Sequence, residues 1–260
     1  MTETIDLADV ARRALPLVDL TNLNDDCTAE DITALCKRAV TAHGTVAAVC
    51  IYPQFVAQAV RELKGTGVRV ATVVNFPAGG TETLDVVAET KKAVEDGADD
   101  IDLVMPYRAF MDGRKGFAEE QIIQVKAAIP APAILKVILE TGEIRDPLLI
   151  HMASQIAIGA GADFIKTSTG KVEVNATLEA AEIMLTAIEE ARRDHQKNVG
   201  FKPAGGIRTV EEAGAYLALA DRILGHNWVS AQTFRFGASG LLNALIGALD
   251  GTNASAGEGY

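Results

Sequence analysis

Cysteine, histidine and aromatic residues are scarce in this chain of 260 residues, and each scarcity argues against a class of protein or site. The three cysteines include no C-x-x-C pair, so neither a disulfide framework nor a zinc ribbon is expected. The four histidines stand apart in the sequence and offer no metal-ligand set and no Ser-His-Asp triad. We therefore expect no bound metal. Aromatic residues make up only 5 %, which leaves Ala, Val, Leu and Ile to build the core.

Basic residues and long apolar runs are also few. The chain has 24 Lys and Arg against 35 Asp and Glu, a formal net charge of −11. Because Lys and Arg supply most of the affinity for phosphate backbones, we expect neither a nucleic-acid partner nor an anionic membrane surface. No apolar stretch reaches the roughly 18 uncharged residues of a membrane span. The N-terminus, MTETIDLADVARRAL, lacks the pattern of a signal peptide. The sequence thus predicts a soluble, cytoplasmic protein, with which a homodimer is compatible.

Short β-branched runs alternate with longer segments of helical periodicity along the chain. Eight runs are predicted as strands, at 15–20, 45–52, 68–75, 100–105, 133–139, 163–167, 199–203 and 235–237. Helices are predicted at 29–42, 53–64, 81–96, 117–128, 146–159, 178–194 and 210–220, with capping boxes at Thr28 and Thr209. The strands start about 30 residues apart, as a repeated strand–loop–helix unit requires.

These units predict the α/β class and a (β/α)₈ TIM barrel with an extra N-terminal helix. Such a barrel commonly takes about 250 residues, which gives a single domain over 1–250 and a flexible tail over 251–260. The hydrophobic fraction of 48 % suits parallel strands that are buried on both faces. No G-x-G-x-x-G turn follows the first strand, which weakens the dinucleotide-binding alternative.

Charged residues embedded in the apolar strands are the candidates for chemistry: Asp19, Asp102, Lys136, Lys166 and Lys202. Catalytic groups of TIM barrels lie at the carboxyl ends of the strands, which are about 4.8 Å apart, so the three lysines should crowd one pocket. Like charge and burial both disfavour an ammonium group. We therefore expect at least one lysine pKa to fall, which frees an amine to attack a carbonyl.

These residues alone leave two candidates for the nucleophile, Lys166 and Lys202. The opposing interpretation is that the lysines merely form an ion network with Asp19, Asp102 and Glu140. In the catalytic interpretation, Asp102 accepts and donates a proton near the carbon that becomes nucleophilic.

A short internal repeat in the sequence predicts that Asp102 and Lys166 lie at the same level of the barrel. The segment GADDID at 97–102 resembles GADFIK at 161–166. The offset corresponds to two strand–helix units, so the two side chains are expected at equivalent heights on strands four and six.

Two loops that contain glycine predict an anion site. KPAGGIRT at 202–209 begins in the seventh predicted strand, and RFGASG at 235–240 begins in the eighth. Glycines let backbone N–H groups approach an anion, and the helix that follows each loop adds a favourable dipole. Phosphate sites in TIM barrels often lie at these two loops, so a small anionic substrate is expected.

Segments in all eight predicted strands together resemble the deoxyribose-phosphate aldolase family. They include GADDIDLVMPYRA (97–109), LKVILETGE (135–143), GADFIKTSTGK (161–171), VGFKPAGGIRT (199–209) and RFGASGLL (235–242). The resemblance implies a class I aldolase of deoxyribose phosphate catabolism. Members cleave 2-deoxy-D-ribose 5-phosphate reversibly to D-glyceraldehyde 3-phosphate and acetaldehyde, through a lysine Schiff base and without a metal or organic cofactor.

The resemblance also assigns roles. The imine-forming lysine within FIKTSTG falls on Lys166. The lysine of GFKPAGG, Lys202, perturbs it and takes part in a proton relay that Asp102 joins, and Lys136 and Asp19 are supporting residues. The phosphate contacts of the family fall on Lys171, Gly205, Gly206, Arg208, Gly237 and Ser239.

Three further positions qualify this assignment. Gly240 stands where relatives often have serine, so a hydroxyl contact to phosphate is lost although the backbone N–H remains available. Some relatives end in a tyrosine that reaches the active site, which Tyr260 would supply here unless the tail is disordered. Cys50, inside the second predicted strand, is expected to pack as a small core residue rather than act as a nucleophile.

Two alternatives stay open at this point. One is another Schiff-base barrel aldolase, either transaldolase-like or a keto-acid lyase, which would prefer a different donor from acetaldehyde. The other is a non-catalytic barrel that binds a sugar phosphate, whose function would survive Lys166→Ala.

Overall fold

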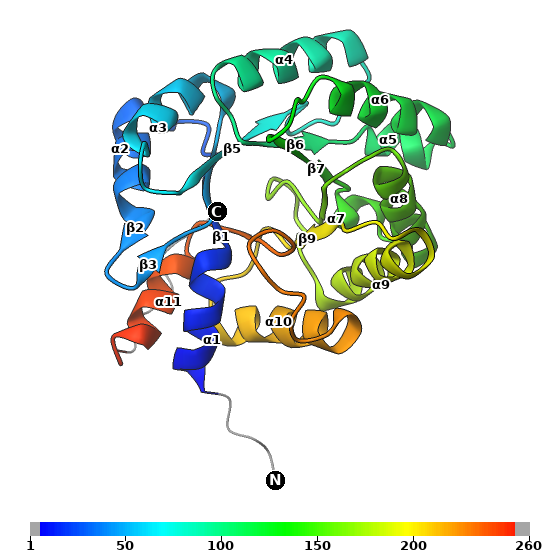
Figure 1. Cartoon of the computed structure of the whole chain (residues 1–260). Helices are drawn as coiled ribbons and strands as arrows, with labels where there is room; N and C mark the ends of the chain where they lie inside the picture. Colours follow the sequence, from blue (N-terminus) through cyan, green and yellow to red (C-terminus); the bar gives the residue numbers. More distant parts are fainter. Residues whose placement is uncertain (1–5, 253–260) are drawn as a thin grey trace.

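In the computed structural model, which describes residues 6–252, eight parallel strands form one closed sheet (Figure 1). The strands lie in the order β10, β1, β4, β5, β6, β7, β8 and β9, and parallel bridges from Phe201 to Phe234 and from Ala204 to Gly237 close the ring. Their bounds are β1 Val18–Asn22, β4 Ala48–Ile51, β5 Arg69–Val74, β6 Asp100–Val104, β7 Ile134–Ile138, β8 Phe164–Lys166, β9 Gly200–Lys202 and β10 Phe236–Ala238. The predicted TIM barrel is confirmed.

Helices surround the barrel as an outer ring (Figure 1). They are α1 Leu7–Ala14, α2 Ala29–Arg38, α3 Val56–Glu62, α4 Thr83–Glu95, α5 Tyr107–Met111, α6 Lys115–Ala127, α7 Thr141–Ile144, α8 Pro147–Gly159, α9 Leu178–His195, α10 Val210–Leu224 and α11 Leu241–Leu249. Both predicted capping boxes, at Thr28 and Thr209, are present. The extra helix α1 packs beside α10 and α11, where Arg13 forms an ion pair with Asp221.

Two local predictions were wrong. Residues 15–17 form a 3₁₀ turn instead of starting the first strand, because Pro16 has no N–H to give to a strand ladder. The helix predicted over 29–42 ends at Arg38, and a hairpin of β2 (Val40–Thr41) and β3 (Gly44–Thr45) follows it. The hairpin turn is possible because Gly44 has a φ of +122°, which other residues rarely adopt.

The strand register arranges the barrel interior in layers. The tilt of TIM-barrel strands shifts the level by about one residue per strand, so residues of alternate strands share a layer. Asp102 pairs with Lys136 and Lys136 with Phe164, which puts Lys166, two residues further on, level with Asp102. The same count around the ring gives three layers of four residues. The lower layer contains Ala48, Asp100, Phe164 and Arg235, and the middle layer contains Asp19, Ala71, Lys136 and Lys202. The upper layer, nearest the carboxyl ends of the strands, contains Cys50, Asp102, Lys166 and Gly237.

Each layer combines long charged side chains with small ones. On the side of β4 and β5 the interior is apolar and small, formed by Ala48, Cys50 and Ala71 together with Leu23 and Val73. These short side chains leave room for the lysines and Arg235 that extend from the opposite strands. The barrel is thus a packed core with a charged half and an apolar half.

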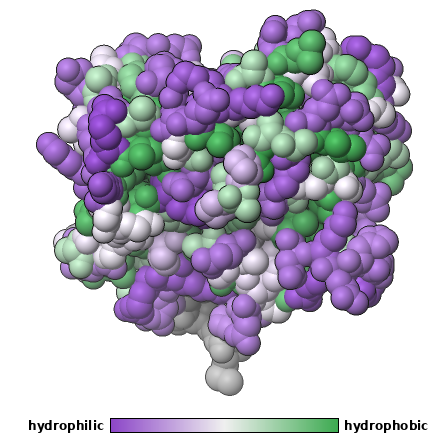
Figure 2. Space-filling view, turned by 45° about the horizontal axis from the view of Figure 1, so that its top comes forward, coloured by the Kyte–Doolittle hydropathy of each residue, from purple (hydrophilic) through white to green (hydrophobic). Residues whose placement is uncertain are grey.

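The outer surface is mostly polar. Figure 2 shows hydrophilic side chains over much of the visible face, with hydrophobic ones between them. The most exposed large apolar side chains are Leu84 on α4 and Leu148 on α8, at 81 % and 78 %. No helix within residues 6–252 is long and apolar enough to cross a membrane.

Candidate active site

Asp102 is the centre of a charged cluster inside the barrel. Lys166 Nζ, at the carboxyl end of β8, donates to Asp102 Oδ2 at 2.9 Å. Lys202 Nζ donates to the same oxygen at 2.8 Å and to Asp19 Oδ2 at 2.6 Å. Lys136 Nζ donates to Asp102 Oδ1 at 3.0 Å. The structure therefore brings together all five charged residues that were predicted from their positions in the apolar strands.

Two members of the cluster were missed in the sequence. Asp100 Oδ2 accepts from Lys136 Nζ at 2.7 Å, and Arg235 Nη1 donates to Asp19 Oδ1 at 2.7 Å and to Asp100 Oδ2 at 3.3 Å. Asp100 could have been found, because it lies two residues before Asp102 on one strand and so faces the same side. Glu140, the third expected partner, makes no ion pair with the lysines.

The cluster brings four buried cationic side chains against three buried carboxylates. A fifth cation, the partly exposed Arg69, forms an ion pair with Asp100 Oδ1 at 2.6 Å. Among the residues that the structure describes, no group of three or more His, Cys, Asp or Glu could hold a metal ion. The carboxylates are bonded instead to ammonium and guanidinium groups, so the cluster is a network of ion pairs.

This network sets pKa values in a direction that the sequence did not predict. Burial raises the pKa of Asp102, but Lys136, Lys166 and Lys202 together hold it well below the ordinary 3.8. Burial lowers the pKa of Lys202, but Asp102 and Asp19 raise it well above 10.5. Lys202 is therefore not a lysine whose pKa falls, because the three lysines are interleaved with carboxylates rather than facing one another.

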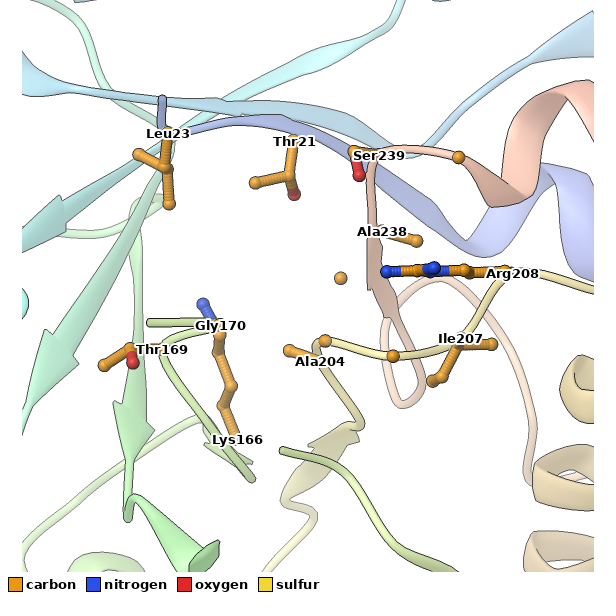
Figure 3. A pocket seen from close by; sticks show the side chains of 14 residues that line it. Thr21, Leu23, Lys166, Thr169, Gly170, Ala204, Ile207, Arg208, Ala238 and Ser239 are labelled. Carbon is orange, nitrogen blue, oxygen red and sulfur yellow. The ribbon is translucent and has the colours of Figure 1, made fainter. Parts of the chain in front are cut away.

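Lys166 differs from the other two lysines in its access to a pocket. Lys136 and Lys202 are completely buried, whereas Lys166 is 3 % exposed and lines the pocket at the mouth of the barrel. Figure 3 shows its amine pointing into this pocket, with Thr21 and Leu23 on one side and Ser239 and Arg208 on another. The geometry thus separates the two nucleophile candidates that the sequence had left open.

The two glycine loops form the wall of the pocket beyond Lys166. The lining includes six of the seven predicted phosphate-binding residues: Gly205, Gly206, Arg208, Gly237, Ser239 and Gly240. In the loop after β9, Gly205 has a φ of +82°, and a Cβ there would lie 2.8 Å from the Asn175 side chain. In β10, a Cβ on Gly237 would lie 2.7 Å from that of Ala204, in the loop after β9. These glycines let the loops pack against their neighbours.

The remaining predicted residues lie elsewhere. Lys171 is not among the pocket-lining residues, and its Nζ donates to Asp25 Oδ1 at 3.0 Å in the loop after β1. Cys50 lies in the top layer with Asp102 and Lys166, and burial raises the pKa of its thiol, as fits a core residue. Tyr260 and the tail from residue 253 onward lie outside the described residues.

The pocket also has a wall that sequence reasoning missed, formed by Thr21, Leu23 and the segment Thr169–Gly170. Thr21 Oγ1 donates to the Asp19 carbonyl at 2.8 Å, so its lone pairs can accept from a substrate hydroxyl. Its position two residues after Asp19 on β1 was the available signal, since both side chains then face the interior.

A TIM barrel with one lysine amine at the base of a pocket and two glycine loops above it has the parts of a Schiff-base aldolase. Sequence comparison gives the family. The pattern of the DeoC/LacD family aldolases matches residues 13–246, and the chain belongs to this family. It is therefore an aldolase, a carbon–carbon lyase.

Three relatives show how similar the chain is to known proteins. A deoxyribose-phosphate aldolase of Agrobacterium fabrum is 57 % identical over 254 residues, which cover 97 % of this chain and 96 % of the relative. A solved structure assigned to deoxyribose-phosphate aldolase from Coccidioides immitis is 30 % identical, with a TM-score of 0.77 over 95 % of this chain and 87 % of that one. One from Toxoplasma gondii is 26 % identical, with a TM-score of 0.84 over 97 % and 100 %.

Proposed function

We propose that this aldolase cleaves 2-deoxy-D-ribose 5-phosphate reversibly to acetaldehyde and D-glyceraldehyde 3-phosphate, with Lys166 as the imine-forming amine. The observation that carries the proposal is the pocket that joins Lys166 to the two glycine loops. A short sugar phosphate presents an aldehyde at one end and a phosphate at the other, which matches these two ends of the pocket. The similarity to the Agrobacterium aldolase supports the same substrate.

Lys166 is the lysine of the cluster that can meet a substrate. Its side chain lines the pocket, whereas Lys136 and Lys202 are completely buried. Asp102 and Asp19 raise the pKa of Lys202, so Lys202 remains an ammonium while the Lys166 amine attacks a carbonyl.

The cleavage follows from these positions. Lys166 Nζ adds to C1 of the open-chain aldehyde, and loss of water leaves a protonated imine. The Asp102–Lys202 relay accepts the proton of the C3 hydroxyl, the C2–C3 bond breaks, and its electron pair moves into the imine to give an enamine. D-glyceraldehyde 3-phosphate leaves. The relay returns a proton to C2, and water hydrolyses the imine to release acetaldehyde and the free Lys166 amine.

The phosphate end is held by the loops after β9 and β10. The proposed contacts are the side chains of Arg208 and Ser239 and the backbone N–H of Gly206. The N–H groups of Gly205 and Gly237 donate to Gly237 O and Pro203 O, so these two glycines shape the site rather than donate to the phosphate. Gly240 contributes its backbone. Lys171, which follows the pocket-lining Gly170, would have to exchange Asp25 for the phosphate to take part.

We further propose that the enzyme works in the cytoplasm as a metabolic aldolase. Its three cysteines, Cys27, Cys36 and Cys50, are free thiols, as suits a reducing compartment. The homodimer remains a prediction, which analytical ultracentrifugation of the full chain would test.

The test is borohydride trapping. Wild-type protein incubated with 2-deoxy-D-ribose 5-phosphate and borohydride should carry one adduct, on the peptide that contains Lys166. Lys166→Ala should lose the adduct and more than about 10⁴-fold in kcat, the scale on which removing a covalent nucleophile acts. Lys92→Ala, on the exposed face of α4, is the matched control and should behave as wild type. An adduct elsewhere, or none, would overturn the assignment.

A donor panel separates the alternative aldolases. In the synthetic direction with D-glyceraldehyde 3-phosphate, acetaldehyde should be the preferred donor over pyruvate and dihydroxyacetone. Preference for a keto acid or a ketose donor would instead support a keto-acid lyase or a transaldolase-like enzyme. A non-catalytic barrel would bind sugar phosphate without any turnover.

A further inference from the structure

Glu140 is a buried carboxyl group beside the active site to which the cleavage assigns no role. It follows β7 by two residues and is completely buried. Its φ is +61°, and it is the only non-glycine residue with a positive φ that is buried in the described part of the chain. Left-handed backbone in a buried, bulky residue persists only where the surroundings require it, and such strain gathers at functional sites.

The surroundings of Glu140 are the segment that follows Lys166. On either side of Glu140 the backbone is bonded to that segment, because Leu139 N donates to Lys166 O at 3.0 Å and Thr141 N donates to Thr167 O at 2.9 Å. The side chain adds a third point, since its Oε1 accepts from Thr169 N at 3.1 Å. These three hydrogen bonds hold residues 166–169, the segment that runs from the reactive lysine to the wall of the pocket.

The segment held in this way lines the pocket opposite the glycine loops. Thr169 and Gly170 are lining residues, and Figure 3 shows Thr169 and Gly170 across the pocket from Arg208 and Ser239. A carbon chain that is bound to Lys166 at one end and to the loops at the other must pass this wall. The position of Thr169 therefore limits how the C2–C3 bond is oriented.

We infer that Glu140 is a positioning residue of the aldol cleavage, which holds Thr169 N and thereby fixes the wall against which the Lys166-bound substrate lies. The inference rests on the proposed function of Lys166. The left-handed backbone conformation of Glu140 turns its side chain toward Thr169, which explains why a strained residue stands at this position.

The environment of the carboxyl group supports a hydrogen-bonding role rather than a role as an ion-pair partner. Burial raises the pKa of Glu140, while the bond from Thr169 and the charge of Lys166 lower it less. Its Oε2 and the Ser168 hydroxyl have no hydrogen-bond partner among the residues that the structure describes. A side chain with one good acceptor and no ion pair can be replaced by an amide of equal length.

Three substitutions test the inference. Glu140→Gln keeps the acceptor for Thr169 N, so its kcat should stay within about threefold of wild type. Glu140→Asn tolerates the left-handed backbone but is one carbon too short to reach Thr169, and a misplaced wall should lower kcat by about 10- to 100-fold. Glu140→Gly removes both the strain and the tether, so its melting temperature should be at least that of wild type while its kcat falls like that of the Asn variant.

Binding of inorganic phosphate, measured as competitive inhibition, should change less than about threefold in all three variants, because the glycine loops are untouched. Glu143→Ala, in α7, which begins one residue after Glu140, is the matched control and should leave kcat unchanged. Equal losses in Glu140→Gln and Glu140→Asn would overturn the inference, since Glu140 would then act through its charge. Wild-type turnover in Glu140→Asn or in Glu140→Gly would overturn it too. Failure of the wild type to form the Lys166 adduct would instead refute the proposed function.

Discussion

Replacing Asp102 with asparagine removes the centre of the buried charged cluster. In the native barrel this carboxylate accepts from Lys166 at 2.9 Å, Lys136 at 3.0 Å and Lys202 at 2.8 Å. An asparagine amide offers one acceptor oxygen, and its NH₂ group would face ammonium groups that cannot accept a hydrogen bond. Asp19 and Asp100 would remain against the three lysines, Arg235 and the partly exposed Arg69, so positive charge would be buried without compensation.

The expected magnitude is large. Removing one partner of a buried ion pair costs about 3–5 kcal/mol, a substantial part of the roughly 5–15 kcal/mol by which folded domains are stable. At about 2–4 °C per kcal/mol, the melting temperature should fall by roughly 6–20 °C. Loss of the proton relay should also lower kcat by about 10²- to 10⁴-fold.

Urea denaturation followed by circular dichroism measures the stability, and release of acetaldehyde measures kcat. Asp96→Asn is the matched control, because Asp96 pairs with Lys92 on the surface of α4 and such pairs contribute at most about 1 kcal/mol. The reasoning would be refuted if Asp102→Asn were as stable as Asp96→Asn. Unchanged kcat in a folded Asp102→Asn variant would remove Asp102 from the mechanism.

Two further predictions concern acid stability and packing. The pKa values of Asp19 and Asp102 lie below the ordinary 3.8 in the folded protein, so their stabilisation is complete above that value and is lost as the pH falls below it. The free energy of unfolding, measured from pH 7 to pH 2, should therefore decline most steeply below about pH 4, and a level profile there would contradict the ion network. Gly237→Ala would put a Cβ 2.7 Å from that of Ala204 and 3.1 Å from Lys202 Cε, and such overpacking should cost about 1–3 kcal/mol and lower kcat. Gly116→Ala, where a Cβ would meet nothing within 4 Å, should cost less than about 0.5 kcal/mol, and equal losses in both variants would argue against the steric explanation.

The barrel was predictable from the sequence because each unit carries its own local signal. Buried parallel strands are β-branched, helices are periodic, and capping boxes such as the one at Thr209 mark where helices begin. Where local signals were weak, the prediction failed. The hairpin after Arg38 depends on the turn at Gly44, and α7 has only four residues, too few to show a period.

The sequence predicted which residues form the site better than it predicted their ion pairs and pKa values. Lysines and aspartates inside apolar strands are easy to recognise in the sequence, and Lys136, Lys166 and Lys202 do lie in one cluster in the structure. Their pairing depends on register between strands that are distant in sequence, which no local pattern reports. Thus Asp100 and Arg235 were missed, and their absence from the prediction made the lysines look mutually repulsive.

The bond between Asp19 and Arg235 joins the first strand of the barrel to its last, across 216 positions of the chain. Strands emerge from the ribosome in order, so Arg235 is made after every other residue of the cluster. Until then Asp19 lacks one of its partners and the ring cannot close. An incomplete chain during translation, or a truncated product, would contain Lys166 without its enclosed pocket, so we expect reactivity toward aldehydes to be acquired only when synthesis of the barrel is finished.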